Sequence, residues 1–173
     1  MDKLNIVYFA FSEKYGDNHA GFTHTYNISK NLGKFVNINI FFSGDKVGLI
    51  KKEGNVNYHT VIFPSTRNLF SLNFINYIKS YFYVKKFVKN SEIIHERFHV
   101  NPIDLLFVNK KYILEVNDPP MILHERFSFI YNFFIRLKFN RSNDIITQTK
   151  TLKNILEKYY KKDIFVVSNG VDT

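Results

Sequence analysis

The chain has 173 residues, 45% of them hydrophobic and 17% aromatic, which excludes a disordered composition and allows one well-packed core. It contains no cysteine, and this excludes disulfides, thiolate metal sites and a cysteine nucleophile. Its net charge of +9 attracts polyanions, such as nucleic acid, anionic lipid or phosphorylated substrates, without selecting among them.

Short apolar runs alternate along the chain with longer segments of helical period. In chain order, the pattern predicts strands at Leu4–Phe11, Val36–Phe42, Tyr58–Phe63, Glu92–Glu96, Tyr112–Val116, Asp144–Thr147 and Ile164–Ser168. It predicts helices near Phe22–Leu32, Ser71–Lys89, Val100–Asn109, Met121–Phe139 and Thr149–Tyr160. This alternation indicates an α/β fold: a single Rossmann-like domain whose mainly parallel, doubly wound sheet has about seven strands with helices on both faces.

Ligands of such sheets bind beyond the carboxyl ends of the strands. The polar and unusual residues of this sequence gather at those ends, in Ser12–Gly21, Glu96–His99, Glu115–Pro120 and Ser168–Thr173. We therefore expect the functional side chains to lie at this edge of the sheet.

The segment His95–His99 matches the H-E-x-x-H pattern of zinc proteases. That chemistry needs both imidazoles on one face of a helix. Here the segment follows a predicted strand, and Asn101–Pro102 comes just after it, which disfavours a helix. We expect a strand-end loop and no metal site. The chain also lacks a Gly-x-Gly-x-x-Gly or P-loop pattern, so a self-contained nucleotide site is not expected.

The predicted helix Ser71–Lys89 has two different faces. The face expected in the core carries Phe74, Tyr77, Tyr81, Val84 and Val88. About a third of the circumference elsewhere carries Lys79, Lys85, Lys86 and Lys89, with Ile75, Ile78 and Phe82 among them. Two interpretations stay open: an anionic membrane binds Lys79, Phe82, Lys85, Lys86 and Lys89, or these lysines are solvated and the apolar residues pack on a neighbouring loop.

Taken in order, five segments resemble the N-terminal domain of glycosyltransferase family four (group 1 type), which has the twin-Rossmann GT-B fold. A first strand followed by Gly21 and a helix with His24 is similar to the family's glycine-rich first loop, although Ala20 stands where a second glycine is usual. Glu92–Arg97 resembles the "D-hydrophobic-hydrophobic-Y-E-R" strand end of one family branch. Tyr112–Pro119 resembles that branch's "vlEvNaP" segment, with Glu125 as its downstream glutamate.

The last two segments, Asp144–Thr147 and Ile164–Asp172, resemble the family's "D-hh-hS" and "vIPNGVD". The second leads into the interdomain hinge of the family, and Ser168 replaces its usual proline. Many relatives have a histidine in the position of Asn117. Asparagine can still form hydrogen bonds there, but it cannot carry a proton.

The resemblance implies transfer of a sugar from a nucleotide-sugar donor to the hydroxyl of a sugar or lipid-linked acceptor, with retention and without a cofactor. Residues 1–173 would form the acceptor-side domain, inactive without a C-terminal donor-binding domain that this chain lacks. The resemblance places in the acceptor cleft Gly21, His24, Glu96, Arg97, Glu115, Asn117, Asp118 and Glu125. It places at the hinge Asn169, Gly170 and Asp172, and it assigns no catalytic residue or metal ligand.

Several alternatives remain open at this stage. The chain would instead be a polyanion-binding module for nucleic acid or membrane, or a non-catalytic subunit of a split glycosyltransferase. Glu96 and Glu115 would instead be structural carboxylates paired with Arg97 or nearby lysines. Because no signal peptide follows Met1 and cysteine is absent, we expect a cytoplasmic protein, peripheral on the inner membrane face if its basic helix binds lipid. Nucleic acid is not an expected partner, since no RNA-binding signature is present.

Overall fold

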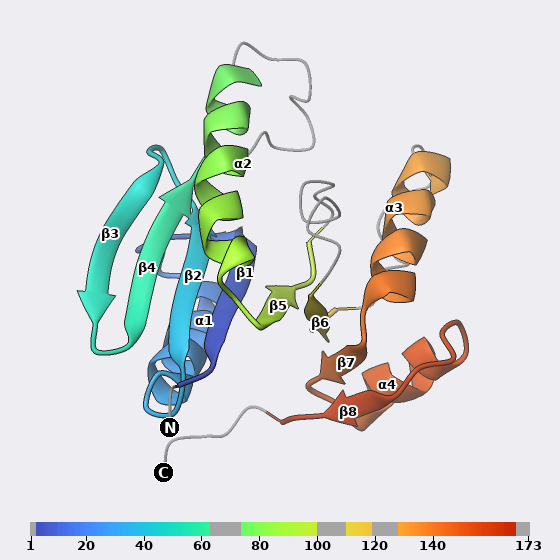
Figure 1. Cartoon of the computed structure of the whole chain (residues 1–173). Helices are drawn as coiled ribbons and strands as arrows, with labels where there is room; N and C mark the ends of the chain where they lie inside the picture. Colours follow the sequence, from blue (N-terminus) through green and yellow to red (C-terminus); the bar gives the residue numbers. More distant parts are fainter. Residues whose placement is uncertain (1–2, 63–73, 100–109, 119–127, 169–173) are drawn as a thin grey trace. The chain divides into compact units, whose positions relative to one another are not determined.

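The computed structural model describes residues 3–62, 74–99, 110–118 and 128–168. These residues form eight strands and four helices (Figure 1). Their internal contacts divide the chain into two compact units, Met1–His95 and Glu96–Thr173. Strand β5 (Ile93–Arg97) runs across the boundary between the two units.

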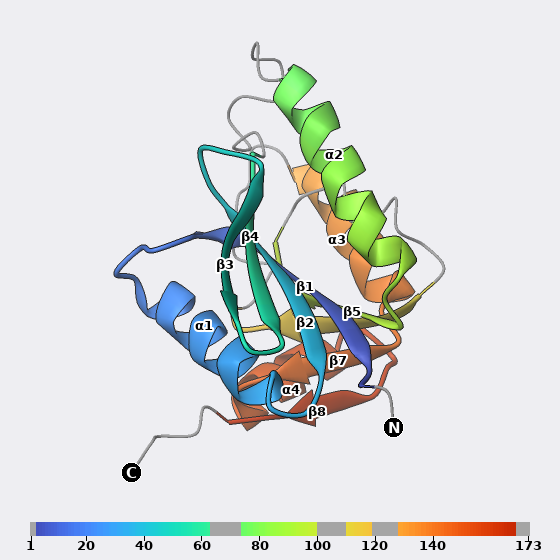
Figure 2. The ribbon, with the colours of Figure 1, turned by 60° about the vertical axis from the view of Figure 1, so that its left-hand side comes forward.

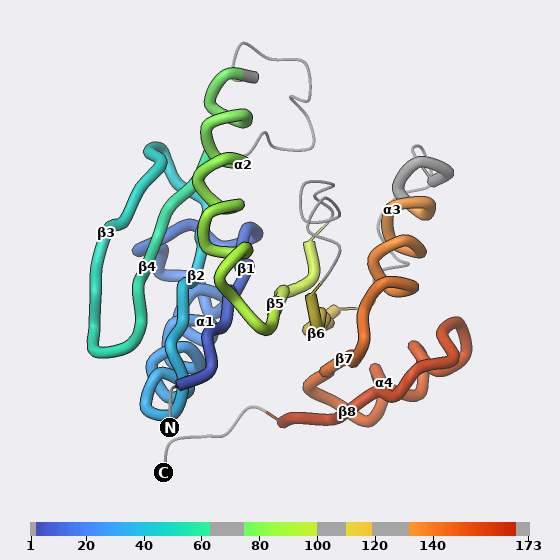
Figure 3. Tube along the Cα trace, in the orientation of Figure 1, coloured from blue at the N-terminus to red at the C-terminus, as the bar shows by residue number. Residues whose placement is uncertain are grey.

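The first unit contains a sheet with strand order β3-β4-β2-β1. Its strands are β1 (Asn5–Lys14), β2 (Asn37–Ser43), β3 (Gly48–Glu53) and β4 (Val56–Val61). The pairs β1–β2 and β2–β4 are parallel. Strand β3 pairs antiparallel with β4 through a tight turn at Gly54, whose φ of 56° favours glycine, and the tube in Figure 3 shows this hairpin at the sheet edge.

Helices cover both faces of this sheet, because side chains of each strand alternate between the faces. On one face, Tyr8, Phe42 and Tyr58 pack against Phe22 and Tyr26 of α1 (Ala20–Leu32). Figures 1 and 2 show α1 and α2 (Phe74–Lys89) on opposite sides of the strands.

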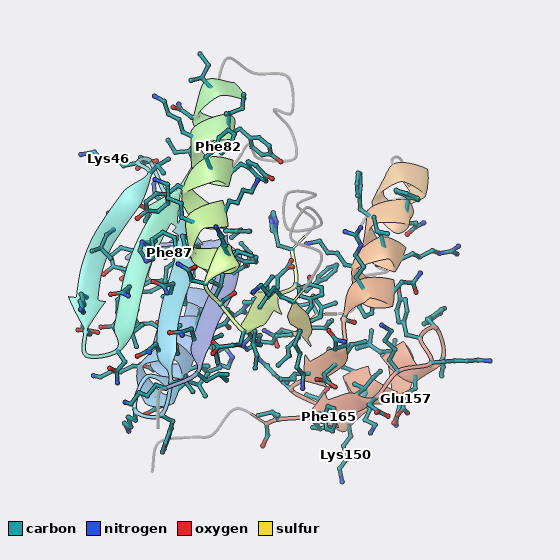
Figure 4. The ribbon with its side chains drawn as sticks, in the orientation of Figure 1. Lys46, Phe82, Phe87, Lys150, Glu157 and Phe165 are labelled. Carbon is teal, nitrogen blue, oxygen red and sulfur yellow. The ribbon has the colours of Figure 1, made fainter. Side chains whose placement is uncertain are left out.

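The side of the sheet that α2 covers is aromatic and contains a buried histidine. The His59 ring stacks on Phe41 with centroids 4.7 Å apart, and Phe87 of α2 lies 4.6 Å from the His59 ring (Figure 4). The ring nitrogens of His59 lie 2.8 Å from the Tyr83 hydroxyl and 3.2 Å from Asn39 Oδ1. Both polar atoms of the imidazole therefore have partners inside the core.

The second unit is built on the parallel strands β6 (Lys111–Val116), β7 (Asp144–Thr147) and β8 (Ile164–Val166). Helix α3 (Ser128–Arg141) connects β6 to β7 and α4 (Lys150–Glu157) connects β7 to β8. Helix α4 begins at an N-cap, Thr149, whose side chain accepts a hydrogen bond of 3.1 Å from Leu152 N. Phe139 of α3 stacks on Tyr160, with ring centroids 3.9 Å apart.

The predicted fold class, α/β and Rossmann-like with mainly parallel strands, is confirmed. Seven predicted strands correspond to observed ones within three residues at either end. About seven strands were expected and the described residues form eight, the additional one being β3, which was not predicted. Its sequence Gly-Leu-Ile-Lys-Lys-Glu has no run of buried residues, because an edge strand is open to solvent.

Helices α1, α2, α3 and α4 correspond to four of the five predicted helices, with α4 shorter than expected. The fifth predicted helix, Val100–Asn109, lies outside the described residues, as do the predicted helical residues 71–73 and 121–127. No described helix is long and apolar enough to cross a bilayer.

Candidate functional site

In the first unit, the carboxyl end of β1 contains a bulge that faces the start of α1. Ala10 pairs with Phe42 and Lys14 pairs with the next residue of β2, Ser43, so residues 11–13 have no register partner in β2. The Ser43 hydroxyl donates a 2.9 Å hydrogen bond to the main-chain oxygen of Glu13. This hydrogen bond connects the bulge to the end of β2.

The Glu13 carboxylate lies directly on Gly21, in the first turn of α1. A Cβ atom at Gly21 would be 2.6 Å from both Cδ and Oε1 of Glu13. A side chain at position 21 would therefore meet the far end of the Glu13 side chain, which would have to move. His24 is half-buried on the same helix, one turn further along. Glu13 was not singled out from the sequence, because nothing in it signals the bulge.

In the second unit, Glu96 is fully buried near the carboxyl end of β5. Its Oε1 pairs with the Lys138 ammonium of α3, which is also fully buried, and its Oε2 accepts a hydrogen bond from the Tyr112 hydroxyl. One interpretation of the sequence paired Glu96 with a lysine. The structure shows such a pair, and its lysine lies 42 residues away in the chain. Both carboxylate oxygens are engaged inside the unit.

His99 lies just beyond β5, near this buried ion pair. Burial, and secondarily the Lys138 charge, lower the pKa of His99 to about 4, against an opposing effect of Glu96. Its Nδ1 is buried and has no hydrogen-bond partner among the residues that the structure describes. The imidazole is therefore neutral at pH 7.

A carboxylate–amide pair lies at the carboxyl end of β6. Glu115 is 4% exposed, and its Oε1 accepts a 2.9 Å hydrogen bond from Asn117 Nδ2. The main-chain oxygen of Glu115 accepts a 2.7 Å hydrogen bond from Phe98 N, which ties the ends of β5 and β6 together. Glu115 thereby orients the Asn117 amide, whose buried Oδ1 has no partner within the described part of the chain.

The remaining predicted site residues fall into two groups. Arg97 is half-buried at the end of β5, and Asp118 is exposed after β6. Glu125, Asn169, Gly170 and Asp172 lie outside the described residues. The structure thus joins Glu115 to Asn117 by a hydrogen bond and pairs Glu96 with Lys138 and Tyr112, all within the second unit, while Gly21 and His24 belong to the first.

The H-E-x-x-H segment does not form a helix. His95, Glu96 and Arg97 belong to strand β5, which ends one residue beyond the predicted strand end at Glu96. The His95 ring stacks on Tyr8 with centroids 4.3 Å apart and an interplanar angle of 4°. No cluster of three or more metal-ligating side chains occurs in the described ranges.

No family model matches this chain, and no curated protein matches it. Among solved structures, a sucrose-phosphate synthase from Thermosynechococcus elongatus is similar in fold, with a TM-score of 0.60 and 9% identity. That match covers 97% of this chain and 90% of the other.

Two α,α-trehalose-phosphate synthases are also similar in fold. The enzyme from Burkholderia vietnamiensis, described as UDP-forming, has a TM-score of 0.51 at 13% identity, over 91% of this chain and 42% of that one. The enzyme from Burkholderia multivorans has a TM-score of 0.51 at 11% identity, over 97% and 48%. The chain thus spans about half the length of these two synthases. At such identities the likeness establishes a shared fold.

Proposed function

We propose that this chain is the acceptor-side part of a nucleotide-sugar glycosyltransferase of the GT-B type, which transfers a sugar to an acceptor hydroxyl with retention. The observation that carries the proposal is the fold, which is similar over nearly the whole chain to synthases of sucrose phosphate and trehalose phosphate. The five sequence segments that resemble family four support it independently. In this proposal the donor binds mainly to a C-terminal domain, and residues 1–173 supply the acceptor groove.

The Glu115–Asn117 pair is the part of the site with the clearest chemical role. Buried Glu115 holds one amide proton of Asn117, so the Asn117 Oδ1 is oriented to accept a hydrogen bond from a sugar hydroxyl. Glu96 does not face a ligand in this proposal; it fixes the end of β5 through Lys138 and Tyr112. Arg97, Asp118, Glu125, His24 and the hinge residues Asn169, Gly170 and Asp172 remain proposed site residues on the resemblance alone.

The first experiment measures heats of binding for a panel of nucleotide sugars and free nucleotides. It uses this chain alone and the chain extended past Thr173 with the coding sequence that follows it. Binding only to the extended protein supports the acceptor-side assignment and names the donor. Tight binding to the short chain would place the nucleotide site in these 173 residues, and binding to neither would contradict the proposed function.

In the extended protein, once its sugar transfer can be assayed, replacing Asn117 by alanine is expected to lower kcat/KM by about 10- to 100-fold. The reason is that one oriented hydrogen-bonding group is lost. The measurement is the initial rate of sugar transfer at several acceptor concentrations. The matched control is Asn154→Ala, on the exposed side of α4, which should leave the rate unchanged. Equal rates for the parent protein and Asn117→Ala would remove Asn117 from the site.

A second proposal concerns the exposed surface of α2, where the predicted basic face is found. Ile75, Ile78 and Phe82 are exposed, Phe82 by 56% (Figure 4). On the same third of the circumference lie the exposed lysines Lys79, Lys85, Lys86 and Lys89. The described helix contains no acidic residue. We propose that this surface binds an anionic lipid bilayer, with the apolar side chains in the interface and the lysines at the headgroups.

The test is sedimentation with vesicles of phosphatidylcholine alone or mixed with phosphatidylglycerol, at rising salt. Lys85→Glu/Lys86→Glu should weaken binding to the anionic vesicles by at least about tenfold, since each lysine contributes about 1 kcal/mol near such a surface. Lys150→Glu/Lys158→Glu makes the same charge change on exposed residues at α4 and should have a smaller effect. Equal recovery with neutral and anionic vesicles would contradict this proposal.

A further inference from the structure

The two edges of the sheet in the second unit differ in how their polar atoms are hydrogen-bonded. Near the amino ends of the strands, Asn143 Oδ1 accepts a 2.8 Å hydrogen bond from Tyr112 N, and Asn143 N donates one of 2.7 Å to Tyr112 O. The Lys162 ammonium, which precedes β8, donates a 2.7 Å hydrogen bond to Asn140 O at the end of α3. The chain thus satisfies these groups by itself.

Three buried polar atoms at the carboxyl edge have no hydrogen-bond partner among the described residues: His99 Nδ1, Asn117 Oδ1 and Thr147 Oγ1. They lie just beyond β5, just beyond β6 and at the last residue of β7. In the described part of the second unit, such atoms occur nowhere else. Thr147 is fully buried, so its hydroxyl loses its hydration on folding without a partner in return. Such atoms are rare in folded proteins and indicate a partner that the chain does not supply.

Hydrogen bonding between the strands places these three residues at nearly the same level. Phe98 N donates a 2.7 Å hydrogen bond to Glu115 O, which fixes the end of β5 beside the end of β6. Thr147 is the register partner of the last residue of β6, after which Asn117 follows directly. Neighbouring strands are about 4.8 Å apart, so the three chain positions span about 10 Å. Because side chains alternate between the faces of a sheet, Asn117 and Thr147 come to this edge from opposite faces, and a ligand bound across the strand ends would lie between them.

The chemistry of the three atoms indicates what kind of ligand they bind. The Glu115 carboxylate can only accept hydrogen bonds, so it holds the Nδ2 side of the Asn117 amide at 2.9 Å and leaves Oδ1 as an acceptor. Oδ1 therefore needs a ligand that donates a hydrogen bond, which a phosphate dianion or a carboxylate does not. The Thr147 hydroxyl donates or accepts, and His99 is neutral at pH 7 because burial lowers its pKa to about 4. The hydroxyl groups of an uncharged sugar match all three atoms, and the buried Glu115 carboxylate disfavours an anion beside it.

We propose that His99, Asn117 and Thr147 bind the hydroxyl groups of a neutral sugar across the ends of β5, β6 and β7. Asn117 accepts a hydrogen bond from one hydroxyl, and Thr147 and His99 form hydrogen bonds with others. The site thereby selects an uncharged group over a phosphorylated one at this position. Naming the sugar as the acceptor of the transfer rests on the proposed function, whereas the binding of a sugar does not.

The experiment titrates the isotope-labelled 173-residue chain, at physiological salt, with neutral hexoses and N-acetylhexosamines and, separately, with inorganic phosphate. It follows the side-chain amide resonances of Asn117 and the main-chain amide resonances of His99 and Thr147. At least one neutral sugar should shift these resonances in a saturable manner, and inorganic phosphate should not. The absence of a saturable shift with every sugar, or equal shifts with phosphate, would overturn the proposal.

Thr147→Val is the decisive variant, because it replaces the hydroxyl by a methyl group of similar size. It should weaken sugar binding by at least about fivefold, while the melting temperature stays equal or rises, since no described group loses a hydrogen bond. Asn117→Ala should weaken sugar binding as well. A lower melting temperature for Thr147→Val would assign the hydroxyl to folding, and an unchanged affinity would leave it with a buried water as its partner. Either result contradicts the proposal.

Thr60→Val is the matched control, since it makes the same change at a buried threonine of β4, in the first unit. It should leave the affinity for sugar unchanged, and a loss equal to that of Thr147→Val would overturn the assignment. A chain that binds neutral sugars, while its extended form binds no nucleotide sugar, would support this site and contradict the proposed function. Donor binding to the extended protein without sugar binding at these residues would support the proposed function and contradict this site.

Discussion

Replacing Lys138 by methionine is expected to lower the free energy of unfolding by about 3–5 kcal/mol, among the largest effects for one substitution in this chain. Lys138 and Glu96 are both fully buried and form an ion pair. Methionine keeps most of the volume of lysine, so the loss is that of leaving the Glu96 carboxylate buried without a cation. Urea or guanidinium unfolding of the parent and variant chains measures the difference.

The double variant Glu96→Gln/Lys138→Met should recover most of this stability. It leaves no buried charge at these two positions, and the glutamine oxygen still accepts the hydrogen bond of the Tyr112 hydroxyl. Lys153→Ala, which breaks the solvent-exposed pair with Glu157 in α4, should cost less than about 1 kcal/mol. A loss of similar size for Lys153→Ala and Lys138→Met would show that the Glu96–Lys138 pair is not a special structural element.

Acidification from pH 7 to pH 4 is expected to lower the free energy of unfolding by roughly 3 kcal/mol through His59 alone. Burial lowers the pKa of His59 to about 4, from an ordinary value of 6.5. Between these two values the unfolded chain binds a proton at this residue and the folded chain does not, so stability falls as the pH falls. Above pH 6.5 the residue is neutral in both states and makes no pH-dependent contribution. The measurement is denaturant unfolding at a series of pH values.

His59→Phe should reduce this pH dependence, because phenylalanine fills the space between Phe41 and Phe87 without titrating. The variant loses stability at pH 7, since Tyr83 and Asn39 lose their hydrogen-bond partner. His99, whose pKa is also lowered to about 4, keeps its own share of the pH dependence. A His59→Phe slope equal to that of the parent would contradict the prediction.

The sequence predicts those parts of the fold in which local pattern and tertiary packing agree. β7 is found at its predicted residues, because Asp144–Thr147 has two central apolar residues in a buried parallel strand. β3 was missed, because its consecutive lysines Lys51 and Lys52 are typical of an edge and give no buried period. β1 extends past its predicted end to Lys14, because a bulge lets pairing resume at a position without an apolar signal.

The sequence predicts only those parts of the candidate site that depend on local pattern. The strand-end position of Glu115 and Asn117 follows from the sequence. Glu115 lies at the end of an apolar run, and Asn117 comes directly after it. The partners of Glu96 could not be predicted from the sequence. Lys138 is far from Glu96 in the chain, and it belongs to a helix whose apolar residues do not gather on one face. The contact of Glu13 with Gly21 depends on the bulge, and no residue type in that segment reports it.

The outer edge of β3 affects how copies of this chain can associate. Its outer backbone groups have no strand beside them in the described sheet, and such a row is a template for hydrogen bonding to another molecule. A second copy that aligned its own β3 there would bring Lys51 and Lys52 of both molecules close together, at a Coulombic cost. Self-association through this edge is therefore disfavoured, although Leu49 and Ile50 are exposed on it. An extended segment rich in aspartate or glutamate would meet no such repulsion.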